Sequence, residues 1–230
     1  MRRAACLLLL FAGSCNALGR SGDSDFPPAD RPVSDIISSQ FSDEETRDKR
    51  NEAETVMDMA EIEPGMTVAD IGAGNGYYTI RLAPRVGETG RVLAQDVIAE
   101  TRDRLAERVT RERLDNVSVR LGEFADPKLP ADSFDRIFMV HMYHEIESPY
   151  EFLWNMRPAL RDDGRVVVVD ADRPTNRHGT PPDLLNCEFE AVGYRRVVFR
   201  EMPGIGGYFA MFVRAGPRPD PGDIEPCGQD

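Results

Sequence analysis

Apolar and polar positions along this chain alternate in a way that predicts repeated strand and helix units. Short apolar runs typical of buried strands occupy residues 68–71, 91–95, 116–121, 134–140 and 165–170. Between them, apolar residues recur at helical spacing, as Leu105 and Val109 do. Strands that alternate with helices build a parallel sheet, so we expect an α/β fold with helices on both faces.

The end of the chain departs from this alternation. Two β-rich runs at residues 194–200 and 207–214 are joined by residues 201–206, which are too few for a crossover helix. They are therefore expected to pair antiparallel, as a hairpin at the edge of a mostly parallel sheet.

Local signals place several boundaries. A capping-box pattern at residues 42–45 predicts one helix over residues 43–60. Another helix should begin at Tyr77 and end before Pro84, because proline lacks the amide N–H that continues a helix. Two more are expected over residues 148–160 and 182–192, and residues 162–164 are interpreted as a turn.

Three glycines directly follow the first apolar run. Gly72, Gly74 and Gly76 carry no side chain to keep a ligand from the backbone, and the next helix presents unpaired N–H groups there. The dinucleotide fingerprint needs a small residue at the position of Tyr77. The spacing therefore favours a nucleoside-binding turn of another kind. A sharp bend without a ligand is the alternative.

Asp96 ends the second apolar run, 20 residues after Gly76. A carboxylate at this place can accept hydrogen bonds from both hydroxyls of a ribose. The competing interpretation is an N-cap of the next helix, for which aspartate is also favoured.

These motifs, together with Phe134 and Asp135 at the start of the fourth run, resemble class I S-adenosylmethionine-dependent methyltransferases over residues 43–214. The resemblance implies the Rossmann-like seven-stranded methyltransferase fold and S-adenosylmethionine as cofactor. It also implies that Asp70 faces the cofactor and that Glu123, where the family commonly has aspartate, or Phe124 meets the adenine. The predicted cofactor-binding residues are Asp70, Gly72, Ala73, Gly74, Gly76, Asp96, Val97, Glu123, Phe124 and His141.

The predicted catalytic residues follow the fourth strand. Ligands of parallel sheets bind at the carboxyl ends of the strands, which nominates His141, Tyr143, His144 and Asp170. We expect His144 to act as general base, Tyr143 to shape the pocket and His141 to form part of the cofactor wall. A structural hydrogen-bonding role is the alternative for each. His178 is a further candidate for substrate contact, and Arg47 and Arg50 either reach an anionic group or pair with Glu44 and Glu54 on their own helix.

Composition narrows the choice of partner. A net charge of −12 argues against nucleic acid, so we expect a small-molecule acceptor, which includes one dissolved in a lipid phase. No His or Cys spacing typical of a metal site is present, and none is predicted. Two alternatives remain: an exported protein that binds a nucleoside-like ligand without catalysis, and a nicotinamide oxidoreductase, which Tyr77 and the hairpin disfavour.

The first 19 residues resemble a secretory signal peptide: a basic start, an apolar run too short to cross a membrane, and small residues. Cleavage before Cys15 would leave a lipidated cysteine, whereas cleavage after residues 17–19 would leave none. We expect an exported protein, either periplasmic or a membrane-anchored lipoprotein, without a transmembrane helix.

The remaining boundaries complete the expected organisation. Residues 20–41 are predicted to be a flexible linker, 42–214 the methyltransferase domain and 215–230 a disordered tail. An oxidising compartment permits a disulfide between Cys187 and Cys227, but the position of Cys227 in the tail disfavours it.

Overall fold

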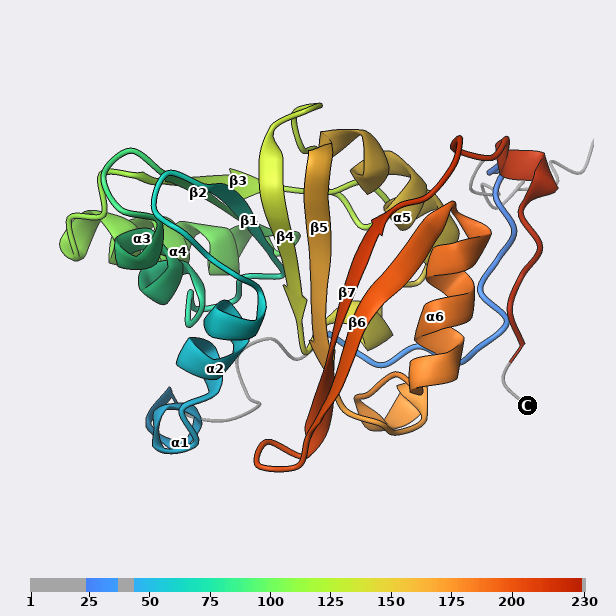
Figure 1. Cartoon of the computed structure of the whole chain (residues 1–230), viewed down its shortest axis with the longest axis horizontal. Coiled ribbons are helices and arrows are strands. Elements are labelled where there is room, and N and C mark those ends of the chain that lie inside the picture. Colours follow the sequence, from blue (N-terminus) through green and yellow to red (C-terminus); the bar gives the residue numbers. More distant parts are fainter. Residues whose placement is uncertain (1–23, 37–43, 229–230) are drawn as a thin grey trace, which may run out of the picture.

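Seven strands form one mixed sheet in a computed structural model that describes residues 24–36 and 44–228 (Figure 1). The strands are β1 (Thr67–Ile71), β2 (Arg91–Asp96), β3 (Val117–Leu121), β4 (Phe134–Val140), β5 (Leu160–Asp170), β6 (Tyr194–Met202) and β7 (Gly207–Arg214). Their order is β3-β2-β1-β4-β5-β7-β6, and β7 runs antiparallel to both of its neighbours. The expected fold class, including the terminal hairpin, is confirmed.

Helices cover both faces of the sheet. They are α1 (Glu44–Lys49), α2 (Glu52–Met59), α3 (Thr79–Val86), α4 (Ala99–Arg111), α5 (Pro149–Met156) and α6 (Pro182–Ala191). Alternate residues of a strand point to opposite faces. In β4, Phe138 packs with α2 and α3, whereas Ile137 packs with α5 and α6. Helix α4 places Leu105 and Val109 against β2 and β3, as its spacing predicted.

The strand order reverses between β1 and β4. The chain leaves β1 toward β2 on one side and leaves β4 toward β5 on the other, so the loops after β1 and β4 separate. A crevice forms outside the carboxyl ends of parallel strands at such a switch point. The fold therefore places the glycine turn and the histidines of the loop after β4 around one space.

Three predicted boundaries are wrong. The helix expected over residues 43–60 is two helices, α1 and α2, which are separated at Asn51 by a left-handed backbone with φ of 52°. Helix α3 continues through Pro84 to Val86, because the burial of Leu82, Ala83 and Val86 outweighs one lost backbone hydrogen bond. The turn expected at residues 162–164 lies inside β5, within a register shift against β4 where the pairing jumps from Leu160 to Arg165.

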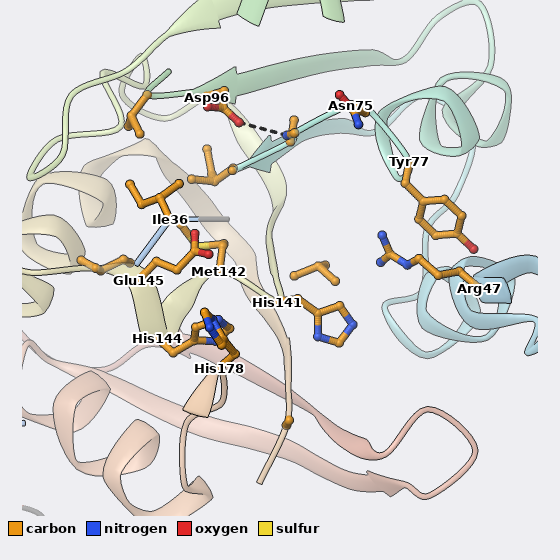
Figure 2. A pocket seen from close by; sticks show the side chains of 18 of the residues that line it. Ile36, Arg47, Asn75, Tyr77, Asp96, His141, Met142, His144, Glu145 and His178 are labelled. Atoms are coloured by element: carbon orange, nitrogen blue, oxygen red, sulfur yellow. Dashed lines mark hydrogen bonds between the residues drawn. The ribbon is translucent and has the colours of Figure 1, made fainter. Parts of the chain in front are cut away.

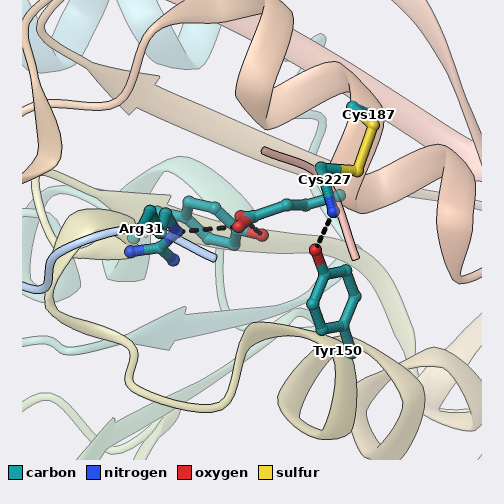
Figure 3. Close-up of a disulfide and its surroundings, with 6 residues drawn as sticks. Arg31, Tyr150, Cys187 and Cys227 are labelled. Atoms are coloured by element: carbon teal, nitrogen blue, oxygen red, sulfur yellow. Dashed lines mark hydrogen bonds and ion pairs between the residues drawn. A yellow bond between two sulfur atoms is a disulfide. The ribbon is translucent and has the colours of Figure 1, made fainter. Parts of the chain in front are cut away.

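Residues 24–36, here called the N-terminal strap, pack on the domain and are not the free linker that the sequence predicted. The side chain of Arg31 is buried and its Nε donates to Glu188 Oε1 at 2.7 Å (Figure 3). Ser34 is also buried, and its backbone N–H donates to the carbonyl oxygen of His144. Residues 20–23 and 37–41 of the expected linker lie outside the described residues, as does the predicted signal segment 1–19.

The tail was also expected to be disordered, and residues 215–228 are instead ordered on the domain. Cys227 forms a disulfide with Cys187 of α6, and its backbone N–H donates to the hydroxyl of Tyr150 (Figure 3). Ile224 is buried in the core beneath it. The disulfide that the sequence disfavoured is therefore present, because long-range burial fixes a segment whose composition is typical of coil.

Candidate functional site

A cavity of about 630 Å³ opens at the carboxyl ends of β1, β2 and β4, where the strand order reverses (Figure 2). Its wall runs from Asp96 and Phe124 on the β2 side, past the glycine turn, to His144 and His178 on the β5 side. Residues from segments far apart in the sequence thus face one space. Figure 2 shows Asp96 and the histidines on opposite sides of it.

The glycine turn brings bare backbone to the cavity. Gly72 and Gly74 line it with φ of 64° and 56°, a left-handed conformation that side chains disfavour. Gly76 has a different role, since a Cβ there would lie 2.4 Å from Leu105 Cδ1. Its small size lets the turn approach α4, and it is not among the cavity-lining residues, contrary to its expected contact with the cofactor.

Asp96 lies at the far end of the turn and also lines the cavity. One carboxylate oxygen accepts from the amide of Gly74 at 3.0 Å, and the other accepts from the amide of Ile98 at 2.9 Å. Burial raises the pKa of Asp96, and these amide donors oppose that shift. Each oxygen retains a second lone pair, so the carboxylate can still accept ribose hydroxyls.

Asp70 does not face the cavity, which corrects the role implied by the family resemblance. Its carboxylate is buried and accepts a hydrogen bond of 2.6 Å from the hydroxyl of Thr79 at the start of α3. Desolvation raises the pKa of Asp70 to about 6 despite this bond. The predicted adenine contact Glu123 is likewise off the wall and pairs with Lys128, whereas Phe124, Val97 and Ala73 do line the cavity.

Arg47 lies at the opposite end of the turn, against the ring of Tyr77 at 3.8 Å from its centroid. It pairs with Glu52 at 2.5 Å and not with Glu44, while Glu54 pairs with Arg85 and not with Arg50. The (i, i+3) and (i, i+4) pairs considered for these arginines are thus not formed.

Glu52 contacts both Arg47, on the cofactor side of the cavity, and His141. It accepts from Arg47 and from the hydroxyl of Tyr78, and it lies 3.4 Å from Nε2 of His141. Burial alone would raise the pKa of Glu52, but the bonds from His141 and Arg47 outweigh it and lower the pKa to about 2. Nothing in the sequence singled out Glu52, because its partners come from three separate segments.

His144 is buried at the edge of the cavity with its ring held by Asp170. Its Nδ1 lies 3.0 and 3.1 Å from the two oxygens of Asp170. The same carboxylate accepts from the amide of Ala171 and from the hydroxyl of Thr180. Both oxygens of Asp170 are placed to accept from Nδ1–H, and in a neutral imidazole the lone pair then lies on Nε2.

Tyr143, the other predicted catalytic residue, points away from the cavity. Its side chain is fully buried, and its hydroxyl donates to Glu188 at 2.7 Å. Burial raises the pKa of Tyr143 well above its usual value, so the hydroxyl stays neutral. Its position supports the strap through Glu188 and Arg31, and it does not shape the site as predicted.

Two further groups join His144. One ligand atom each of His144, Glu145 and His178 lie within 4.8 Å of one another, and all three residues line the cavity (Figure 2). The sequence showed no metal-ligand spacing, because the two histidines come from loops after different strands. Only the adjacency of β4 and β5 brings those loops together.

The comparisons with known proteins agree with this geometry. A family model described as a methyltransferase domain matches residues 62–192. The chain belongs to the methyltransferase domain family. A solved S-adenosylmethionine-dependent methyltransferase from Aquifex aeolicus superimposes with a TM-score of 0.64 at 26% identity, over 75% of this chain and 98% of that one. These matches identify S-adenosylmethionine as the cofactor.

Curated relatives are similar over part of their length. Residues of this chain are 43% identical over 84 residues to the nocamycin O-methyltransferase of Saccharothrix syringae, covering 36% of this chain and 30% of that protein. They are 31% identical over 145 residues to a ubiquinone/menaquinone biosynthesis C-methyltransferase of Methylococcus capsulatus, covering 62% and 56%. The chain thus spans about a third of the first relative and just over half of the second.

The residues along the cavity fit S-adenosylmethionine. The backbone of Gly72 and Gly74 is open to the cavity, and Asp96 has acceptor capacity for ribose hydroxyls. Arg47 offers a cation for the cofactor's carboxylate, and the exposed ring of Phe124 offers an apolar surface for the adenine. When bound, this cofactor supplies an activated methyl group.

Proposed function

We propose that this protein transfers a methyl group from S-adenosylmethionine to a small-molecule acceptor bound beside His144. The supporting observation is one cavity with two chemically different halves. Asp96 and the glycine turn form the half suited to a nucleoside, and His144 with Asp170 forms the other. Methyl transfer needs donor and acceptor held together in a space that excludes water, which a shared cavity provides.

His144 is proposed as the group that meets the acceptor. Asp170 holds the Nδ1 proton, so Nε2 carries the lone pair that can take a proton from an acceptor hydroxyl or amine. His141 stands between the halves, with its ring tied to Glu52. This arrangement supports an acceptor that enters from the side of His178 and Glu145.

The net charge of −12 supports an acceptor other than nucleic acid. The lipid-phase acceptor of the sequence analysis is kept as one class to be tested, alongside phenols and amines. Within the residues that the structure describes, no helix has the length and apolar character to cross a bilayer.

Calorimetry with S-adenosylmethionine, S-adenosylhomocysteine and NAD tests the cofactor half. We expect saturable binding of the first two and none of NAD. Release of S-adenosylhomocysteine is then measured with panels of phenols, amines and detergent-dissolved quinols. Cofactor binding with no turnover on any class would favour the non-catalytic alternative, and binding of NAD alone would favour the oxidoreductase.

We further propose that the protein is exported. The basic and apolar pattern of residues 1–19 supports this, as does the disulfide between Cys187 and Cys227, since disulfides persist in oxidising compartments. Cell fractionation with mass spectrometry of the mature N-terminus is the test. A lipid on Cys15 that is lost in Cys15→Ser would support the lipoprotein form, and an intact N-terminus in the cytosolic fraction would refute export.

A further inference from the structure

The cluster of His144, Glu145 and His178 has the composition of a metal site. It supplies two imidazole nitrogens and one carboxylate, with their ligand atoms within 4.8 Å of one another. Metal bonds of about 2.0 to 2.2 Å place tetrahedral ligand atoms about 3.4 Å apart, so a small contraction of side chains would enclose an ion. Three protein ligands leave further coordination positions open, as in catalytic metal sites.

Asp170 supplies the hydrogen bond that commonly orients a metal-binding histidine. Metal-binding histidines characteristically donate their other ring N–H to a carboxylate, which fixes the tautomer and makes the ligating nitrogen more basic. Asp170 accepts from Nδ1 of His144 and is itself held by Thr180 and the amide of Ala171. Nε2 of His144 is therefore the nitrogen available to bind a metal ion.

The N-terminal strap holds the two histidine loops together. The backbone N–H of Ser34 donates to the carbonyl of His144, and the hydroxyl of Ser34 accepts from the amide of His178 at 3.3 Å. The same hydroxyl donates to the carbonyl of Thr175. The ring centroids of His144 and His178 lie 5.5 Å apart. A single buried residue thus preorganises a cluster whose members come from different loops.

We propose that His144, Glu145 and His178 bind one divalent transition-metal ion at the acceptor end of the cavity. Two imidazoles favour ions such as Zn²⁺, Fe²⁺ or Ni²⁺ over Mg²⁺ and Ca²⁺, which prefer oxygen ligands. All three residues line the cavity, so the remaining coordination positions face the acceptor space.

This inference rests on the proposed function for the role of the ion and deepens it. An oxygen atom of the acceptor would occupy an open position, and a bound cation makes such a hydroxyl easier to deprotonate. The acceptor class is then an oxygen-bearing molecule. The metal-ligand role and the base role of His144 use the same lone pair of Nε2, so one experiment decides between them.

Titration of ZnCl₂ and NiCl₂ into the purified, chelator-treated full chain is the direct test. We expect one ion per chain, and affinity at least 100-fold weaker in His178→Ala. Asp170→Asn should weaken binding about 10- to 100-fold, because it disturbs the support and not a ligand. Glu145→Gln preserves shape and should also weaken binding. His141→Ala is the matched control, a cavity histidine outside the cluster, and should bind zinc as the unmodified chain does.

The outcomes separate this proposal from the proposed function. Zinc binding is measured without cofactor and S-adenosylhomocysteine binding without zinc, so either can fail alone. No stoichiometric ion, or equal affinity in His178→Ala and the unmodified chain, overturns the site. Turnover that survives a chelator and still needs His144 overturns the role of the ion and leaves His144 as base.

Discussion

The two halves of the cavity are built in different ways. The centre of the cofactor half comes from one stretch of chain, β1 through β2, which presents backbone atoms and one carboxylate, Asp96, while Arg47 and Phe124 flank it from other segments. The acceptor half comes from the strap, the loop after β4 and the loop after β5, and its groups are side chains. A short stretch of chain supplies the centre of the first half, whereas the second half exists only after long-range packing.

This difference predicts that changes in one half leave the binding function of the other intact. The cofactor half depends on local backbone geometry, and the acceptor half depends on buried contacts of the strap. The predictions below test this separation in order of expected effect.

Gly74→Val should abolish cofactor binding. The residue has φ of 56° and lines the cavity, so a β-branched side chain would strain the turn and fill the space beside Asp96. Calorimetry with S-adenosylhomocysteine measures the loss, and circular dichroism checks the fold. Gly216→Val is the control, because Gly216 also has a positive φ, of 70°, but lies in the tail with nothing within 4 Å of its Cβ position. Equal cofactor affinity in both variants would refute the placement of the site.

Arg31→Met should lower the free energy of unfolding by about 3 to 5 kcal/mol, because it leaves the buried carboxylate of Glu188 without its ionic partner. Chemical denaturation measures this loss, and the double variant with Glu188→Gln should recover most of it. Zinc affinity should fall in the single variant through the loosened strap. Unchanged zinc affinity would contradict the role of the strap in the acceptor half. Loss of affinity for S-adenosylhomocysteine in folded protein would contradict the independence of the two halves.

Asp70→Asn should stabilise the protein at pH 7 and not at pH 4. The pKa of Asp70 is raised to about 6, above its unfolded value, so the native state binds the extra proton between these values. Stability is therefore lost as pH rises through that window, by up to about 3 kcal/mol. Denaturation of both proteins at the two pH values measures the difference. An advantage of the variant that does not shrink on acidification would contradict the burial of this charge.

Asp96→Asn should weaken cofactor binding by about 1.5 to 3 kcal/mol, because a neutral amide replaces a charge-assisted acceptor. Asparagine keeps one acceptor oxygen, which can serve only one of the two amides of Gly74 and Ile98, so circular dichroism checks that the fold survives. Titration with S-adenosylhomocysteine measures the change. Asp126→Asn, at a partly exposed carboxylate off the cavity wall, is the control and should have no effect.

Much of the fold could be predicted because apolar periodicity reports burial directly. The strands, the terminal hairpin and the inward face of α4 follow from local pattern. Helix α3 runs through Pro84 and the tail is ordered at Cys227, against local signals, because distant residues pack over them. Local propensity is weaker than such burial.

The residues of the candidate site also divide into those that the sequence placed correctly and those that it did not. Asp96 and the turn at Gly72 and Gly74 were identified from spacing alone, and they lie on the cavity wall. Asp70, Glu123 and Tyr143 were placed by resemblance or by position after a strand, and each faces elsewhere. Gly76 was placed by the same spacing as Gly72 and Gly74, and it packs against Leu105 of α4 instead of lining the cavity. Strand position determines the end of the sheet at which a residue lies, but it does not determine the direction of its side chain.

The amino-acid sequence by itself determined the fold class, the glycine turn and the carboxylate beside it, because these depend on residues close along the chain. Only the tertiary structure decided that Asp170 orients His144, that His178 and Glu145 join it, and that Arg31 and Cys227 fasten both ends of the described chain to the domain. Such contacts form only when β4, β5 and α6 pack together in the folded protein, and the pattern of residues close along the chain does not indicate that packing.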